Sequence, residues 1–451
     1  MSKEVIDAIF KAYDVRGKVG SELTADLVEK IGRAFGQWLP SEGPVAVGLD
    51  MRPESVELSE ALIKGLNGAG REVWDIGQVT SEMVYFAAGN YRLAGGAVVT
   101  ASHNPGQYNG IKFCADKARA ISIESGLADI RDLVIKDNFQ PANTAGKVLQ
   151  KDIIEDWIEH VLTFIKPDDL KPLKIAVDAG NGMAGKIFPH LEPHVPFEVT
   201  QMYFELDGSF PNHEANPLKF ETLKDIIAVI KDKKLDAGIA FDADGDRAFL
   251  IDETGEVLTA GVMSAMLGEY FLALYPRSKI VHDVRNSRSV PEIIRSNGGQ
   301  PVETKAGHSL IKDKMREVDA PFGGEGSGHF YFRDNWYADS GLIAVLIGLS
   351  VLCKSGTKLS NLRKKYIHYA AIPETNYEVQ DKDKIIAKLS QEFAAEDQYR
   401  LDGLSVNLKN GSWFNVRPSN TEPLLRLNIE ARTNADLMEL EAKVKKIITS
   451  N

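Results

Sequence analysis

Two short segments carry side chains whose types and spacing could perform chemistry together. Residues 100–105 (TASHNP) supply a hydroxyl group, and residues 241–247 (FDADGDR) supply three carboxylates. Each segment follows an apolar run typical of a strand, so each is expected in a loop where a strand ends, a common place for catalytic side chains in α/β proteins. A nucleophilic serine next to a carboxylate site for a divalent metal favours phosphoryl transfer.

The aspartates Asp242, Asp244 and Asp246 alternate with small residues. Carboxylates so close together repel one another, and a bound cation relieves the repulsion; ligation by oxygen alone favours Mg²⁺ over Zn²⁺. An EF-hand loop is a competing interpretation, with Glu253 at its twelfth position. It fails at the sixth position, where Arg247 replaces the required glycine, and both flanks are typical of strands rather than helices. A solvated acidic turn is the remaining alternative.

Ser102 also fits a helix N-cap or a turn residue. His103 follows it directly and is expected to point elsewhere, which disfavours a Ser–His hydrolase pair, and no GxSxG segment surrounds the serine. The functional interpretation gains from residues 108–112 (YNGIK), which could return Lys112 toward the serine. A metal-bound phosphoserine beside a lysine would be a suitable phosphoryl donor.

Two further loops suit an anionic sugar, although each could also be only a turn. Residues 323–329 (GGEGSGH) combine a glycine-rich backbone with groups that bind sugar hydroxyls and exchange a proton. Residues 417–423 (RPSNTEP) offer a guanidinium, two hydroxyls and an amide suited to phosphate oxygens. Further cations come from residues 10–17 (FKAYDVRG) and from Arg285, Arg288, Lys305 and His308.

The elements that must position these loops follow a repeated plan of apolar strand, loop, amphipathic helix and second strand. Continuous β-branched runs alternating with helical spacing predict buried strands in βαβ units. The plan occurs at residues 45–76, 173–200 and 279–304, and after about residue 372 it gives way to a helix, three strands and a terminal helix. We therefore predict three related α/β domains (1–145, 146–252 and 253–368) followed by a smaller α+β domain (369–451).

Composition restricts the class of protein. The chain has 451 residues, of which 43% are hydrophobic and 26% charged, as in globular proteins of several domains. A formal charge of −11 argues against general nucleic-acid binding but allows an anionic small substrate. With no signal-peptide pattern and no bilayer-length apolar run, we expect a cytoplasmic protein without a membrane partner or an obligatory protein partner. Cys114 and Cys353 form no metal or disulfide pattern and are expected to be reduced and buried.

The motifs TASHNP, DADGDR, GEGSGH and RPSNTEP occur in this order in the α-D-phosphohexomutases. Over essentially its whole length the sequence resembles that family, most closely its phosphomannomutase/phosphoglucomutase members. The resemblance implies three α/β domains and a fourth, more mobile domain around a central cleft. It also implies that Ser102 carries a phosphoryl group and that Mg²⁺ is held by this phosphate together with Asp242, Asp244 and Asp246.

The remaining candidate residues fall into two groups. The candidate catalytic residues are Ser102, His103 and four residues that the resemblance places around the reacting phosphoryl group: Arg16, Lys112, Arg247 and His329. The candidate substrate-binding residues are Tyr13, Arg285 and His308, with Glu325 and Ser327 for the sugar hydroxyls and Arg417, Ser419, Asn420 and Thr421 for the phosphate that is not transferred. Lys112 and His329 are the candidates for general base and acid.

The implied reaction moves phosphate between the 1- and 6-positions of a hexose phosphate, mannose and/or glucose. Phosphoserine gives its group to the free hydroxyl, and the hexose 1,6-bisphosphate, which also serves as activator, turns and returns its other phosphate to Ser102. Gly326 stands where related enzymes often carry Met or Gln, so a phosphoglucosamine mutase remains an alternative. A metal-dependent phosphatase, a Ca²⁺-binding module and a catalytically silent sugar-phosphate sensor are the others. The serine, lysine, histidine and aspartates favour an enzyme.

Overall fold

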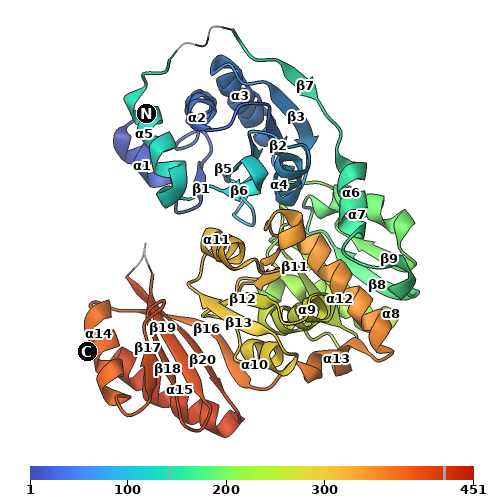
Figure 1. The fold of residues 1–451 in the computed structure, drawn as a ribbon, viewed down its shortest axis with the longest axis vertical. Helices are drawn as coiled ribbons and strands as arrows, with labels where there is room; N and C mark the ends of the chain where they lie inside the picture. The colour runs from blue at the N-terminus through green and yellow to red at the C-terminus, as the bar shows by residue number, and fades with distance from the viewer. Residues whose placement is uncertain (141, 143, 420–422, 451) are drawn as a thin grey trace. The chain divides into compact units, whose positions relative to one another are not determined.

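The computed structural model describes residues 1–140, 142, 144–419 and 423–450 (Figure 1). The chain forms two compact units, each built from two segments of sequence. Unit 1 comprises Met1–Leu258 with Gly328–Ser360, and unit 2 comprises Thr259–Ser327 with Asn361–Asn451. Unit 1 contains both the serine loop and the aspartate loop.

The first sheet of unit 1 has the strand order β1-β5-β4-β2-β3-β7, with β6 paired to β5. Strands β2, β3, β4 and β7 run parallel, and β5 runs antiparallel to β1 and β4. The strands are β1 (Asp14–Lys18), β2 (Val45–Leu49), β3 (Val73–Gln78), β4 (Gly95–Val99), β5 (Tyr108–Ala115), β6 (Arg119–Ala120) and β7 (Val148–Gln150). The helices are α1 (Lys3–Ile9), α2 (Ala25–Trp38), α3 (Ser55–Gly68), α4 (Ser81–Asn90) and α5 (Ala128–Lys136), with short turns η1 (Asp116–Ala118) and η2 (Ile123–Leu127).

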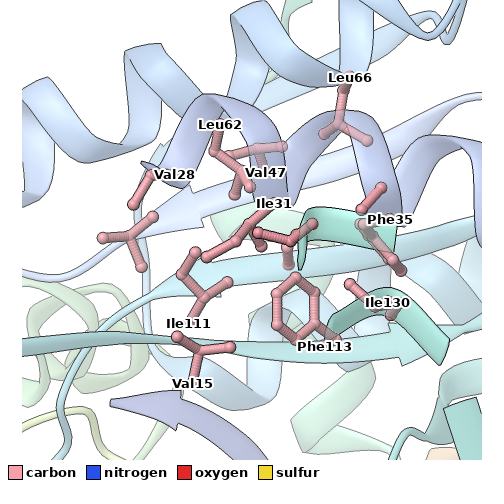
Figure 2. Close-up of a cluster of buried hydrophobic side chains, with 14 of the residues drawn as sticks. Val15, Val28, Ile31, Phe35, Val47, Leu62, Leu66, Ile111, Phe113 and Ile130 are labelled. Atoms are coloured by element: carbon pink, nitrogen blue, oxygen red, sulfur yellow. The ribbon is translucent and has the colours of Figure 1, made fainter. Parts of the chain in front are cut away.

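Helices cover this sheet because its central strands are apolar throughout. Every residue of β2 and β4 is buried, as expected for parallel strands covered on both faces. Figure 2 shows Phe35 and neighbouring side chains of α2, with Leu62 and Leu66 of α3, packed over Phe113 of β5. Helix α4 packs against β2 and β4. This core fixes the ends of β2 and β4, where the serine loop and its supports begin.

The second sheet of unit 1 has the order β11-β10-β8-β9. Its strands are β8 (Leu173–Asp178), β9 (Phe197–Met202), β10 (Ala237–Phe241) and β11 (Ala248–Asp252), parallel except for the β10–β11 pair. The aspartate loop is the turn of that antiparallel pair. The surrounding elements are α6 (Ile154–Leu162), η3 (Pro167–Asp169), α7 (Ala184–Leu191), η4 (Glu192–His194), η5 (Phe220–Leu223), α8 (Lys224–Lys233), β15 (Phe330–Phe332), η6 (Arg333–Asn335) and α12 (Gly341–Ser355). Helix α12 packs against β11.

Unit 2 contains a parallel arrangement β13-β12-β14 and a separate antiparallel sheet β16-β20-β19-β18-β17. The first is formed by β12 (Lys279–Asp283), β13 (Gln300–Thr304) and β14 (Phe322–Gly324), with α9 (Ala260–Leu274), α10 (Ser289–Ser296) and α11 (His308–Val318). The second is formed by β16 (Ala370–Glu378), β17 (Asp397–Tyr399), β18 (Leu404–Asn407), β19 (Trp413–Pro418) and β20 (Leu424–Ala431), with α14 (Lys382–Glu392) and α15 (Asn434–Thr449). Helix α13 (Leu359–Lys365) precedes β16.

The fold class predicted from the sequence, α/β domains followed by a smaller domain with an antiparallel sheet, is confirmed. The division into domains at residues 145, 252 and 368 stays a prediction. Both cysteines are buried, as predicted. Among the described residues no single helix is long and apolar enough to cross a bilayer; only α12 and α13 taken together reach that length and composition, with a bend between them.

Candidate active site

The serine loop and the aspartate loop meet at the ends of two strands of unit 1. Ser102 lies three residues after β4, and Asp242 follows β10 directly. Ser102 Oγ lies 3.3 Å from Asp242 Oδ2, and both residues are buried. The two segments that the sequence singled out are therefore in contact, although 140 positions separate them.

The backbone of Ser102 has an unusual conformation. Its φ of 50° lies in the left-handed region, which serine rarely adopts. The Ser102 amide donates to Thr100 Oγ1 (2.9 Å), and the Asn104 amide donates to the carbonyl of Ala101 (3.1 Å). These local bonds close the turn that presents the hydroxyl.

The expectation that His103 points away from the serine is wrong. His103 Nδ1 lies 3.1 Å from Ser102 Oγ, because the left-handed turn at Ser102 brings the two neighbouring side chains to the same side. Arg247 Nη2, 2.5 Å away, donates to the same nitrogen. Burial, reinforced by the cations Arg247 and Arg16, lowers the pKa of His103 to about 3. The imidazole is therefore neutral, and Arg247 occupies the lone pair that a serine base would need.

The three aspartates form a buried site for a hard cation. Their candidate ligand oxygens all lie within 4.8 Å of one another, and Asp244 Oδ1 accepts no hydrogen bond from any described residue. The loop reverses at Gly245, whose φ of 77° suits glycine. Buried carboxylate oxygens in such proximity, one of them without a donor, fit a divalent ion such as Mg²⁺.

Two cations balance most of this negative charge. Lys112 Nζ donates to Asp244 Oδ2 (2.6 Å) and Asp246 Oδ2 (2.5 Å), and Arg247 Nη2 donates to Asp242 Oδ2 (2.9 Å). Burial raises the pKa of Asp242 to about 7, although Arg247 opposes the shift. Burial also acts on Asp246, but Lys112 outweighs it and holds the pKa of Asp246 well below its usual value. The carboxylates in turn hold the pKa of Lys112 well above its usual range despite its burial.

The remaining candidates of unit 1 lie around the same cluster. Arg16, on β1, donates from Nη1 to Asn104 Oδ1 of the serine loop (2.8 Å). His329 Nε2 lies 3.6 Å from Asp246 Oδ1 and 3.9 Å from Asp339 Oδ2. Tyr13 is half-buried immediately before β1. The structure thus brings together Arg16, Ser102, His103, Lys112, Arg247, His329 and the three aspartates.

Unit 2 holds a second group of candidates at the ends of β12 and β14. Arg285 donates to Asp283 Oδ2 (2.6 Å) and to Glu325 Oε1 (2.5 Å), and the Gly326 amide donates to Asp283 Oδ1 (3.0 Å). The Glu325 carboxylate is therefore held by a fixed guanidinium. Ser327 follows in the same loop, and His308 is the first residue of α11; both are half-buried.

The predicted phosphate loop is only partly described. Arg417, at the end of β19, donates from Nη2 to Glu374 Oε2 (2.8 Å), while its Nε is buried and has no partner among the described residues. Although burial opposes the shift, Arg417 lowers the pKa of Glu374. Ser419 is buried, whereas Asn420 and Thr421 lie outside the described residues.

Sequence reasoning missed several residues that support these groups. Ser81, at the start of α4, donates from Oγ to Asp244 Oδ2 (2.5 Å) and from its amide to the Asp244 carbonyl (3.0 Å). Arg52 contacts the serine loop, and Glu374 contacts Arg417. No sequence spacing signals these contacts, because each partner is more than 40 positions away.

Comparisons with known proteins find matches along nearly the whole chain. Models described as phosphoglucomutase/phosphomannomutase alpha/beta/alpha domains I, II and III and C-terminal domain match residues 7–141, 155–255, 261–369 and 374–447. The chain is 42% identical to "Phosphohexose mutases" of Xanthomonas campestris pv. campestris (strain B100), covering 95% of this chain and 96% of the relative. It is 40% identical to a phosphomannomutase of Salmonella montevideo, covering 96% and 97%. A crystal structure of a phosphoglucomutase/phosphomannomutase family protein from Burkholderia thailandensis aligns with a TM-score of 0.91 at 33% identity, covering 99% and 97% of the two chains.

Proposed function

Because the chain belongs to the phosphoglucomutase/phosphomannomutase family of intramolecular phosphotransferases, we propose that it moves phosphate between the 1- and 6-positions of mannose and/or glucose phosphate. Ser102 carries the phosphoryl group, and a hexose 1,6-bisphosphate is the intermediate and activator. The observation that carries this proposal is the contact of Ser102 Oγ with Asp242 inside a buried cluster of three carboxylates and two cations.

Charge balance supports Mg²⁺ as the cofactor, held by Asp242, Asp244, Asp246 and the Ser102 phosphate. When bound, the ion would stabilise negative charge on the group being transferred. With all carboxylates ionised, three negative charges face Lys112 and Arg247, and the net charge of −1 would become +1 with a divalent ion. A site with a net positive charge suits a phosphoryl group that carries two negative charges.

The side chains of unit 1 have distinct tasks in this proposal. Arg247 and Arg16 orient the phosphoryl oxygens beside Ser102. The raised pKa of Lys112 keeps its amine protonated and makes it a poor proton donor, so Lys112 serves as a fixed positive charge. His329, next to Asp246, is then the candidate that accepts the proton of the attacking sugar hydroxyl.

The residues of unit 2 recognise the substrate in this proposal. Glu325, held by Arg285, accepts hydrogen bonds from sugar hydroxyls, with Ser327 and His308 adding contacts; Tyr13 is the substrate-binding candidate of unit 1. Arg417 offers its guanidinium to the phosphate that stays in place, together with Ser419, Asn420 and Thr421. The relatives' names favour mannose phosphate as one substrate, and the four matched domain models support division of the chain into four domains.

Intact-mass measurement with fragment mapping tests the proposal. We expect phosphate on Ser102 that exchanges with added hexose 1,6-bisphosphate, and neither phosphate nor turnover in Ser102→Ala. A Ser102 that stays unmodified in folded, Mg²⁺-loaded protein would contradict the proposal and favour a sugar-phosphate sensor. Release of inorganic phosphate in place of sugar exchange would favour the phosphatase. A panel of mannose, glucose and glucosamine phosphates then decides the sugar.

A further inference from the structure

Arg52 is a fully buried guanidinium next to the serine loop. It lies between β2 and α3, and its side chain has no exposed surface. Its Nε donates to Asp50 Oδ2 (3.2 Å), and its amide donates to Asp50 Oδ1 (3.0 Å). A buried charge of this kind is costly unless it is paired and hydrogen-bonded, and Asp50 supplies the pairing.

The other four N–H groups of Arg52 face one loop. Nη2 donates to the carbonyls of Ser102 (2.7 Å) and Asn104 (2.6 Å), and Nη1 donates to those of Pro105 (3.0 Å) and Tyr108 (2.9 Å). All five donors of the planar guanidinium are thus used. One of the four acceptors is the carbonyl of Ser102 itself.

These bonds act on a strained backbone. Ser102 has a left-handed φ of 50°, a conformation that persists in a non-glycine residue only where the surroundings hold it. The local bonds of Thr100 and Ala101 come from the loop itself, whereas Arg52 is anchored on the core of the first sheet. Arg52 therefore ties the loop to a rigid element.

Residues 208–210, which follow β9 in the sequence, cover this guanidinium. The ring of Phe210 lies over it, with the centroid 5.2 Å from Cζ. Gly208 approaches so closely that a Cβ there would stand 2.6 Å from Arg52 Cα. The guanidinium is thus enclosed between the serine loop and residues 208–210, a closed setting in which its bonds to the carbonyls are strong.

We propose that Arg52 is a positioning residue that holds the loop of residues 102–108 in the one conformation in which Ser102 Oγ meets Asp242. The inference rests on the proposed role of Ser102 as phosphoryl carrier. Arg52 donates to four backbone carbonyls of the loop and not to Ser102 Oγ, so it acts through the loop's geometry. The geometry needs a planar fork of donors, which a lysine with its single ammonium cannot reproduce.

Arg52→Lys tests this, because it keeps the charge opposite Asp50 and removes the fork. We expect kcat to fall by about 10²-fold, the effect of a misplacement near 1 Å, while KM for the hexose phosphate changes little. Arg71→Lys is the matched control, since Arg71 also donates to three backbone carbonyls, those of Gly36, Leu39 and Ser41, and none of them belongs to the serine loop. The control should lose stability but keep kcat.

Amide hydrogen exchange separates positioning from general loss of structure. In Arg52→Lys we expect faster exchange in residues 100–108 and unchanged exchange in β2 and β4. The inference is overturned if Arg52→Lys keeps its kcat, or if Arg71→Lys lowers kcat equally, or if exchange rises throughout unit 1. Failure of the proposed function is distinguishable, because Ser102 of the wild-type protein would then carry no exchangeable phosphate.

Discussion

Replacing Lys112 by Met tests whether Lys112 compensates the negative charge of the aspartate cluster. Lys112 Nζ lies 2.6 Å from Asp244 Oδ2 and 2.5 Å from Asp246 Oδ2; the lysine side chain is 15% exposed and the carboxylates 0% and 3%. Methionine keeps the apolar stem and removes the charge, so two buried carboxylates lose their ion pair. The cost is dominated by leaving these carboxylates buried and uncompensated.

Removing one partner of a buried ion pair costs about 3–5 kcal/mol. At about 2–4 °C per kcal/mol for a large domain, the unfolding midpoint of Lys112→Met should fall by roughly 6–20 °C in EDTA. A divalent ion held by the same carboxylates would restore the compensation. Saturating Mg²⁺ should therefore raise the midpoint of the variant by more than that of the wild-type protein.

Thermal unfolding followed by circular dichroism, with and without Mg²⁺, measures both effects. Lys186→Met is the matched control: Lys186 lies on α7 outside the cluster, and burial lowers its pKa. Its loss should leave stability nearly unchanged, and Mg²⁺ should raise the midpoint of Lys186→Met as much as that of the wild-type protein. An equal midpoint for Lys112→Met and wild type in EDTA, or equal shifts with Mg²⁺, would refute the reasoning. Turnover of Lys112→Met below its midpoint should be strongly suppressed, and near-normal activity would remove Lys112 from the mechanism.

Two further predictions concern residues that lie outside the candidate sets. Ser81→Ala removes a donor to Asp244 Oδ2 and should weaken Mg²⁺ binding by about 10–100-fold in a calorimetric titration; an unchanged affinity would show that Ser81 does not orient the ligand. His213→Gln should lower stability most at acidic pH: burial opposes protonation, but Asp178, 3.0 Å away, raises the pKa of His213. A raised folded-state pKa contributes stability fully below the unfolded value of about 6.5 and loses it as pH rises through the folded value, so unfolding midpoints of variant and wild type should converge at alkaline pH.

Strand-end motifs were the part of the site that sequence could predict. Ser102 and Asp242 each follow a fully buried apolar strand, and such strands bring their following loops to the functional edge of a sheet. Three of the five strands of the C-terminal sheet, β18, β19 and β20, were also predicted, because apolar residues alternate along them, whereas β16 and β17 were not. In both cases the signal is a local sequence pattern, a continuous apolar run or an alternation, and it can be recognised without knowledge of tertiary contacts.

The contacts that sequence reasoning missed are tertiary. The direction of His103 depends on a left-handed φ at Ser102, and serine gives no local sign of that conformation. Arg52 donates to backbone carbonyls and Ser81 donates to a carboxylate, in each case of residues distant in the sequence. A lone arginine after a strand or a serine at a helix start has many ordinary uses, so its type and spacing do not identify its partner.

In each unit, charged candidate residues form an ion pair with a side chain of opposite sign, and this ion pair holds the candidate side chain in place. Lys112 holds two aspartates in unit 1, and Glu374 holds Arg417 in unit 2. A ligand that binds the candidate side chain carries the same charge as that side chain's ion-pair partner. The ligand must therefore share the candidate side chain with this partner or displace it, and part of the ligand's binding energy is lost. In return the group is held in place before the ligand arrives, which lowers the ordering cost of binding. In the proposed function Nη2 of Arg417 is committed to Glu374, so the phosphate that is not transferred would share the guanidinium with that carboxylate.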